Sequence, residues 1–377
     1  AHPPDGREEL ALSRVSGDDR PFLMSTPRLD SSGDLFLSLP FGSEAARALC
    51  GAREHPVTAA QLDEWCGAQR SRRTHPREAL EALFTAEAPP PRGDPPARGL
   101  QYVGHACVLV STGRENLLFD PLVGYRFPGQ SPRFTMRDLP EAIDCAVVTH
   151  AHRDHYVLET LLQLRSRVRK LVVPRSNAGD LLDPSLELIS RRLGFGDVVG
   201  LQPFDTLELE SCRLRALPFL GEHGDLDLRS RVGYRLELEG ASVMFLADSN
   251  NLDPQLYEHL RDLHGPADTA FIGMECEGAP VSWAYGPLLF GTVTRSMDQA
   301  RRTGGSDAAR ALKVLQALGC RRVFVYAMAL EPWMGMFGGA PCDESSPQMR
   351  EVRRLLAECA SHGIHAELLD GSKAISL

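Results

Sequence analysis

The stretch Thr149-His150-Ala151-His152-Arg153-Asp154-His155 contains three histidines and one aspartate within six residues. It follows the apolar run 143–148, which predicts a buried strand that ends where this cluster begins. An extended chain points His150 and His152 to the same side. We expect Asp154 and His155 to lie at the start of the helix that follows. Four metal-type ligands on a strand-to-helix turn predict two neighbouring metal positions, not solvated polar side chains.

The composition is that of an ordinary soluble globular chain, with 377 residues, 43% hydrophobic residues and a net charge of −9. The acidic balance argues against a broad basic surface for nucleic acid. No apolar run approaches the roughly 18 residues that a membrane span needs. Nine cysteines without CxxC spacing indicate reduced thiols. We therefore expect a cytoplasmic protein that binds neither nucleic acid nor membrane.

A proline-rich segment divides the chain into two parts. Five prolines within residues 89–96 predict a semi-rigid linker, because proline fits neither a helix interior nor a central strand. We expect an N-terminal α+β segment over residues 1–96, which includes this linker, and a catalytic domain over residues 97–377. The N-terminal segment has no catalytic pattern, so it serves packing, docking or oligomerisation, such as a homodimer.

Strand and helix signals alternate through residues 97–377. Turn residues at Glu239-Gly240 predict a hairpin. Ser306 and Gly319 are suited to begin and end a helix with one apolar face. Two β-rich halves, each followed by helices, predict two packed sheets with helices outside, which is an α/β fold.

Three carboxylates follow further predicted strands, namely Glu222, Asp248 and Glu275. A carboxylate next to a buried strand is costly unless it is paired or bound to a metal. One such acid alone would indicate a surface turn, but three beside a histidine cluster indicate ligands. His223 follows Glu222 directly, so either residue could serve as the ligand of that turn. His105 stands alone between two strands and is interpreted as a structural, hydrogen-bonded histidine.

The cluster resembles the HxHxDH signature of the metallo-β-lactamase superfamily, and Asp248 matches the later bridging aspartate of that signature. The resemblance covers about residues 99–377 and implies an αββα sandwich with a two-metal site at the sheet edges. Hydrolases of the superfamily add a histidine at the third motif and another near the C-terminus. Here the third motif contains Glu222 and His223, and no loop motif surrounds the late His362 and His365.

A narrower resemblance accounts for these departures. Several segments look like the diiron β-hydroxylases of nonribosomal peptide pathways, including that of chloramphenicol: 221–225, 247–250, 273–280, 326–328 and 331–333. This resemblance implies O2-dependent β-hydroxylation of an amino acid held as a thioester on a carrier protein, p-aminophenylalanine in the chloramphenicol case. It also implies an external electron donor and a larger N-terminal domain, of which residues 1–96 would be the end.

The residue types agree with iron, because glutamates in place of imidazoles make a site harder and more anionic than zinc prefers. The resemblance implies one iron on His150, His152 and Glu222, and another on Asp154, His155 and, as a third candidate, Glu275, with Asp248 bridging. Glu222, Asp248 and Glu275 would then tune the reaction with O2. The alternative is a dinuclear zinc hydrolase of a thioester, lactam or phosphoester, in which a metal-bound hydroxide attacks.

Overall fold

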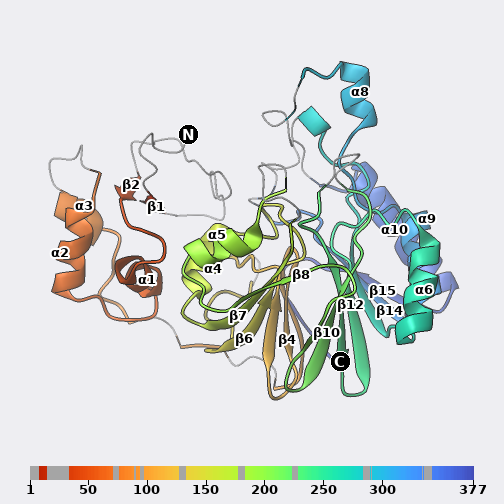
Figure 1. Ribbon diagram of the computed structural model, residues 1–377, viewed down its shortest axis with the longest axis horizontal. Coiled ribbons are helices and arrows are strands. Elements are labelled where there is room, and N and C mark those ends of the chain that lie inside the picture. The colour runs from red at the N-terminus through yellow and green to blue at the C-terminus, as the bar shows by residue number, and fades with distance from the viewer. Residues whose placement is uncertain are drawn as a thin grey trace.

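Two sheets of seven strands each face one another and carry helices on their outer surfaces, so the chain forms four layers in the order αββα (Figure 1). The structure is a computed structural model. It describes residues 8–14, 34–70, 76–88, 91–93, 97–126, 133–176, 183–222, 228–282, 289, 291–332, 334 and 342–377. The predicted metallo-β-lactamase sandwich is confirmed by this arrangement.

The first sheet has the strand order β16-β3-β4-β5-β6-β7-β8. Its strands from β5 to β8 run parallel, so their carboxyl ends meet at one edge. Helices α4 and α5 lie on its outer face (Figure 1). The elements are β3 Gly99–Gly104, β4 Cys107–Ser111, β5 Asn116–Phe119, β6 Ile143–Val147, α4 Leu158–Leu164, β7 Val168–Pro174, α5 Leu186–Arg192, β8 Val198–Leu201 and β16 Lys373–Ile375.

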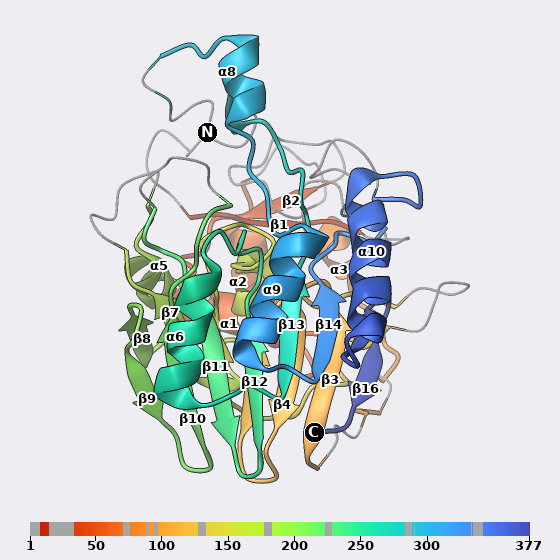
Figure 2. The same cartoon turned by 90° about the vertical axis from the view of Figure 1, so that its right-hand side faces the viewer.

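The second sheet has the order β15-β14-β13-β12-β11-β10-β9, with parallel strands from β12 to β15. Helices α6, α9 and α10 cover its outer face, while α8 projects beyond one edge (Figure 2). The elements are β9 Thr206–Glu208, β10 Cys212–Leu217, β11 Gly233–Leu238, β12 Ala241–Phe245, α6 Pro254–His264, β13 Thr269–Gly273, α8 Arg295–Ala300, α9 Ala308–Leu318, β14 Arg322–Tyr326, α10 Pro347–Ser361 and β15 His365–Leu368.

The core between the sheets is rich in aromatic rings. Phe119 of the first sheet stacks on Phe245 of the second with ring centroids 3.8 Å apart. Phe271 continues this stack at 5.2 Å from Phe245 and touches Phe324 at the same distance. Full burial of such side chains stabilises a fold by roughly 1.5–3 kcal/mol each, so this layer fixes how the two sheets, and the loops at their edges, are placed.

The N-terminal segment forms a small unit with its own core around Leu37, Trp65 and Leu80. Thr58 and Gln61 form a capping box at the start of α2, because each side chain accepts a hydrogen bond from the backbone N–H of the other. The partly buried Glu54–Arg167 ion pair, at 3.3 Å, joins this segment to the first sheet. Its elements are β1 Leu10–Leu12, β2 Leu35–Leu37, α1 Glu44–Gly51, α2 Ala59–Gly67 and α3 Pro76–Glu81. Most of the proline run lies outside the described residues, so the boundary near residue 96 stays a prediction.

Two local predictions differ from the structure. Asp307, not Ser306, begins α9, because the Asp307 carboxylate accepts the backbone N–H of Arg310. Asp154 and His155 lie in a turn that precedes α4, which begins only at Leu158. The turn is closed by a hydrogen bond from the backbone N–H of Tyr156 to the carbonyl oxygen of His152, at 2.8 Å.

The predicted hairpin at Glu239-Gly240 is confirmed by the pairing of β11 with β12.

Candidate metal centre

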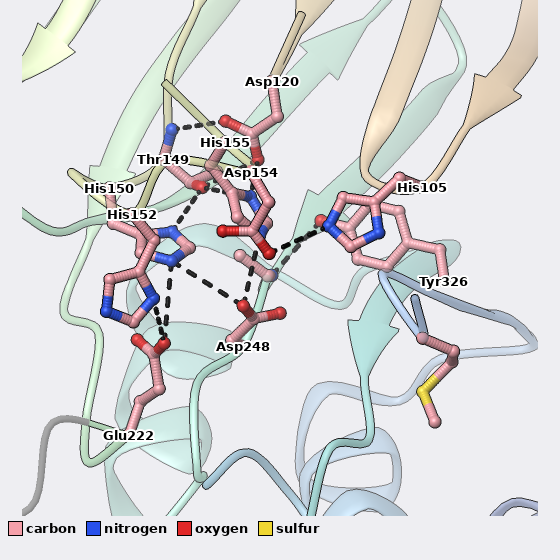
Figure 3. Close-up of polar contacts among 12 residues, drawn as sticks. His105, Asp120, Thr149, His150, His152, Asp154, His155, Glu222, Asp248 and Tyr326 are labelled. Carbon is pink, nitrogen blue, oxygen red and sulfur yellow. Dashed lines mark hydrogen bonds and ion pairs between the residues drawn. The ribbon is translucent and has the colours of Figure 1, made fainter. Parts of the chain in front are cut away.

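The predicted ligands meet at the edge where the parallel strands of both sheets end. The histidine cluster follows β6 of the first sheet, and Asp248 and Glu222 follow β12 and β10 of the second. The two edges are joined directly, because the N–H of Val232 donates to the carbonyl of Thr149 at 2.8 Å. Figure 3 shows the side chains turned toward one another, with His150, His152 and Glu222 on one side and His105 on the other.

A first group of four side chains is able to hold one metal ion, namely His150, His152, Glu222 and Asp248. His152 Nδ1 lies 2.6 Å from Glu222 Oε1. His150 Nε2 lies 3.7 Å from both Glu222 Oε1 and Asp248 Oδ2. Every member except His152 is buried.

A second group lies beside the first and consists of His105, Asp154 and His155. Asp154 Oδ2 is 3.1 Å from His105 Nε2 and 3.9 Å from His155 Nε2. Asp248 Oδ2 approaches His155 Nε2 at 3.1 Å, as well as His150 of the first group at 3.7 Å. One oxygen of Asp248 therefore lies between the two groups, which is where a bridging carboxylate would sit.

Asp120 orients His155, a role that the sequence did not indicate. Its Oδ2 accepts from His155 Nδ1 at 2.8 Å and from Thr149 Oγ1 at 2.7 Å, while Oδ1 accepts the N–H of Thr149 at 2.7 Å. The proton of His155 is thereby held on Nδ1, so Nε2 presents its lone pair to the site. The only sequence signal for Asp120 was its place at the end of the strand that precedes Pro121.

The backbone around Glu222 is held in an uncommon conformation. Glu222 has φ 64° and Gly221 has φ 80°, both in the left-handed region. A Cβ on Gly221 would lie 2.3 Å from the Cβ of Asn250, so this position requires glycine. The carbonyl of Glu222 accepts the N–H of Gly304 at 3.1 Å. These contacts aim the Glu222 carboxylate at the histidines; His223 lies outside the described residues.

Glu275 lies near the site without joining either group. It is partly buried just after β13, and its carbonyl accepts the N–H of Gly305 at 2.7 Å. Burial, together with the nearby carboxylates of Asp248, Asp154 and Glu222, raises the pKa of Glu275 to about 8. The predicted role of Glu275 as a ligand stays a prediction.

The charge of the site fits a pair of metal cations. Burial and the neighbouring carboxylates of Glu222 and Asp154 raise the pKa of Asp248, although His155 opposes them. The other oxygen of Asp248, Oδ1, is buried and has no hydrogen-bond partner among the described residues. The carboxylates of Glu222, Asp154 and Asp248 repel one another, and bound cations would relieve that repulsion. A mixture of imidazole and carboxylate donors suits iron.

His105 is hydrogen-bonded, as predicted, and it lies beside the residues of the histidine cluster, with its Nε2 3.1 Å from Asp154 Oδ2. Burial lowers the pKa of His105, but the Asp154 and Glu331 carboxylates raise it to about 9 overall. The late histidines lie elsewhere: His362 ends α10, and His365 pairs with Arg322 at the start of β14. That is the opposite end of β14 from Tyr326, which lies beside the site (Figure 3).

Comparisons with known proteins decide the family. Residues 4–88 match the N-terminal domain of diiron non-heme β-hydroxylases, and residues 115–326 match the β-lactamase superfamily domain. A curated relative from Streptomyces venezuelae, 4-amino-L-phenylalanyl-[CmlP-peptidyl-carrier-protein] 3-hydroxylase, is 39% identical over 98% of this chain and 70% of its own. The chain belongs to the diiron non-heme β-hydroxylase family.

Solved structures within this family have the same fold. The crystal structure of CmlA, a diiron β-hydroxylase from Streptomyces venezuelae, matches with a TM-score of 0.87 and 38% identity, over 98% of this chain and 69% of that one. A mutant of CmlA β-hydroxylase matches with a TM-score of 0.86 and 36% identity, over the same shares of the two chains. The resemblance inferred from the motifs is confirmed.

No helix in the described part of the chain is long and apolar enough to cross a membrane.

Proposed function

We propose that this chain hydroxylates the β-carbon of an amino acid carried as a thioester on a peptidyl carrier protein, with p-aminophenylalanine as the amino acid. The observation that carries this proposal is the combination of Glu222 in the first ligand group with 39% identity to an enzyme named for that reaction. O2 is the co-substrate, and an electron-transfer partner supplies the electrons.

The ligand assignment follows from the two groups of side chains. His150, His152 and Glu222 would hold one iron, Asp154 and His155 would hold the other, and Asp248 would bridge them. When bound, the two irons supply the redox chemistry that activates O2. Glu275, next to this cluster, is the remaining candidate ligand.

These side chains have separate tasks in the reaction. Asp120 keeps the Nδ1 proton of His155 away from the metal side of the ring. Glu222 contributes negative charge where hydrolases of the fold keep a neutral imidazole, and this charge favours the higher oxidation state of a bound ion. Asp248 offers its Oδ2 to both groups and so couples the two positions electrostatically.

The direct test uses iron-loaded, chemically reduced protein with O2 and an aminoacylated carrier protein. We expect the tethered amino acid to gain one oxygen atom by mass spectrometry, and the free amino acid to gain little. Equal turnover of free and tethered amino acid would remove the carrier protein from the proposal. Turnover that needs neither O2 nor reductant would favour the zinc hydrolase.

Glu222→His separates the oxygenase from the hydrolase at one residue. The substitution removes the negative charge, so we expect a higher reduction potential and slower oxidation of the reduced variant by O2. It would also create a three-histidine position that suits zinc. Single-turnover mixing with O2 measures the rate, and an unchanged rate would mean that Glu222 is not a ligand and that His223 takes its place.

We further propose that residues 1–96 form a unit distinct from the catalytic domain over residues 97–377. The separate apolar core around Trp65 and the family match over residues 4–88 support this division. Limited proteolysis tests it: we expect the first cleavage within the proline-rich run, and initial cleavage inside either unit would argue against the boundary.

A further inference from the structure

We propose that His105 is a positioning residue for Asp154, held in place by Glu331, and that this pair controls how tightly the second metal position retains its ion. The proposal rests on the proposed metal centre and adds to it two residues that belong to neither the HxHxDH motif nor the later carboxylates. His105 comes from the turn between β3 and β4, and Glu331 follows β14.

The backbone of His105 is fixed at both of its polar groups. Its N–H donates a short hydrogen bond to Glu331 Oε1, and its carbonyl accepts the N–H of Ala327 at 3.0 Å. Its φ of 49° is left-handed, a conformation that costs a non-glycine residue roughly 1–2 kcal/mol. Such a conformation persists only where the surroundings determine it, and here the surroundings direct the ring toward Asp154 (Figure 3).

The Asp154 carboxylate is more exposed than the other carboxylates of the two ligand groups. Its side chain is 23% exposed, against 5% for Glu222 and 9% for Asp248. The hydrogen bond from His105 Nε2 to Asp154 Oδ2, 3.1 Å long, fixes the rotation of the carboxylate. In this orientation the same oxygen lies 3.9 Å from His155 Nε2, so the two groups converge on one position.

Glu331 is the buried carboxylate that holds His105 in place. It is a carboxylate of 3% exposure, and burial of such a group is costly without partners. Its partners are the N–H of His105, the ring Nδ1 at 3.7 Å from Oε2, and Arg133 at 4.0 Å from Oε1. Glu331 therefore supports His105 through the backbone N–H, whereas Asp120 supports His155 through the ring, and Glu331 acts one residue further from the metal.

The hydrogen bond also distinguishes a positioning residue from a ligand. A ring nitrogen that donates its proton to Asp154 has no lone pair left for a metal ion. Glutamine can place an amide N–H near the position of the histidine Nε2, but its amide is a poor ligand for iron. If His105→Gln retains iron as tightly as wild type does, His105 is a positioning residue. If His105→Gln loses iron, ligation by His105 is supported.

The experiment follows iron release from the full-length, iron-loaded protein with a ferrous chelator, in the absence of substrate. For His105→Ala we expect two irons per chain at loading, but one of them held about 10–100-fold more weakly, with a changed Mössbauer signal for that iron. His105→Gln should stay close to wild type. Glu331→Gln keeps an acceptor for the His105 N–H and should give an intermediate loss. His362→Ala, at the end of α10, is the matched control and should change nothing.

Two results would overturn the proposal. If both His105→Ala and His105→Gln load only one iron, His105 is a ligand. If release and Mössbauer signals match wild type in His105→Ala and Glu331→Gln, the two residues only fill space. Thermal unfolding of the metal-free variants shows whether each is folded, and Glu331→Gln decides the question if His105→Ala is not. Because no substrate is present, the outcome is independent of whether the proposed hydroxylation occurs.

Discussion

Asp120→Asn changes the charge and the hydrogen-bonding pattern of one buried side chain while it keeps the shape. The carboxylate accepts three hydrogen bonds of 2.7–2.8 Å, from the N–H and the hydroxyl of Thr149 and from Nδ1 of His155. An asparagine oxygen must face the Thr149 N–H, which can only donate. The amide NH2 then faces His155 and forces Nδ1 to accept, so the proton of the ring moves to Nε2.

The magnitude follows from this conflict. A proton on Nε2 of His155 lies on the metal side of the ring, where Asp248 Oδ2 is 3.1 Å away, so His155 stops being a ligand in that tautomer. Loss of such a supporting carboxylate typically weakens metal binding about 10–100-fold. By the rule of 1.4 kcal/mol for each tenfold change, this is about 1.4–2.8 kcal/mol of binding free energy. If the asparagine instead turns its NH2 group toward the Thr149 N–H, two hydrogen-bond donors face each other. This arrangement costs about 1–3 kcal/mol of folding stability.

The assay is competition with a metal chelator, read as the dissociation constant of each iron, together with urea unfolding of the metal-free protein. Asp268→Asn is the matched control, because Asp268 Oδ2 likewise accepts the N–H and the hydroxyl of one residue, Ser242, at 2.8 and 2.9 Å. The control should keep its iron affinity, and because both of its hydrogen bonds reach one oxygen, an amide oxygen can accept both of them. The reasoning is refuted if Asp120→Asn binds both irons as tightly as wild type does.

Three other changes test separate parts of the structure. Gly240→Ala should lose only roughly 1–2 kcal/mol of stability in urea, from backbone strain at a positive φ without a steric contact. Gly221→Ala adds overpacking against Asn250, so the metal-free protein should lose roughly 1–3 kcal/mol more. Equal losses of stability in the two variants would contradict the contact with Asn250. Phe271→Ala should cost about 3–5 kcal/mol in the same assay, because it empties the aromatic layer between the sheets; a loss below about 1 kcal/mol would mean that the layer collapses around the gap. His152→Ala should lose tight binding of at least one iron by metal analysis, and retention of two irons with full turnover would remove His152 from the ligand set.

The sequence predicted the ligands that lie close together along the chain or follow an apolar strand. His150, His152, Asp154 and His155 share one turn, so their proximity needs no knowledge of the fold. Glu222, Asp248 and Glu275 were predicted to lie at strand ends, and the parallel strands bring those ends to one edge. For Glu275 this rule gives the edge but not the direction of the side chain, which depends on the loop after β13.

The supporting residues could not be predicted in this way. Asp120 reaches His155 because β5 pairs in parallel with β6, and His105 reaches Asp154 across 49 residues of chain. Neither contact leaves a local spacing pattern. The choice between Ser306 and Asp307 as the first cap of α9 has a similar cause, since both residue types cap helices and only the backbone direction selects one.

The origin of the ligands in both sheets has a consequence for the lifetime of the protein. Asp248, from the second sheet, lies against histidines from the first, so each bound ion would act as a crosslink between the two halves of the sandwich. Ligands that bind only the native state raise its stability by mass action, and a crosslink absent from the unfolding transition state slows unfolding as well. A chain without iron would open faster and reach proteases sooner, so the supply of iron would set how long the chain persists as well as whether it is active.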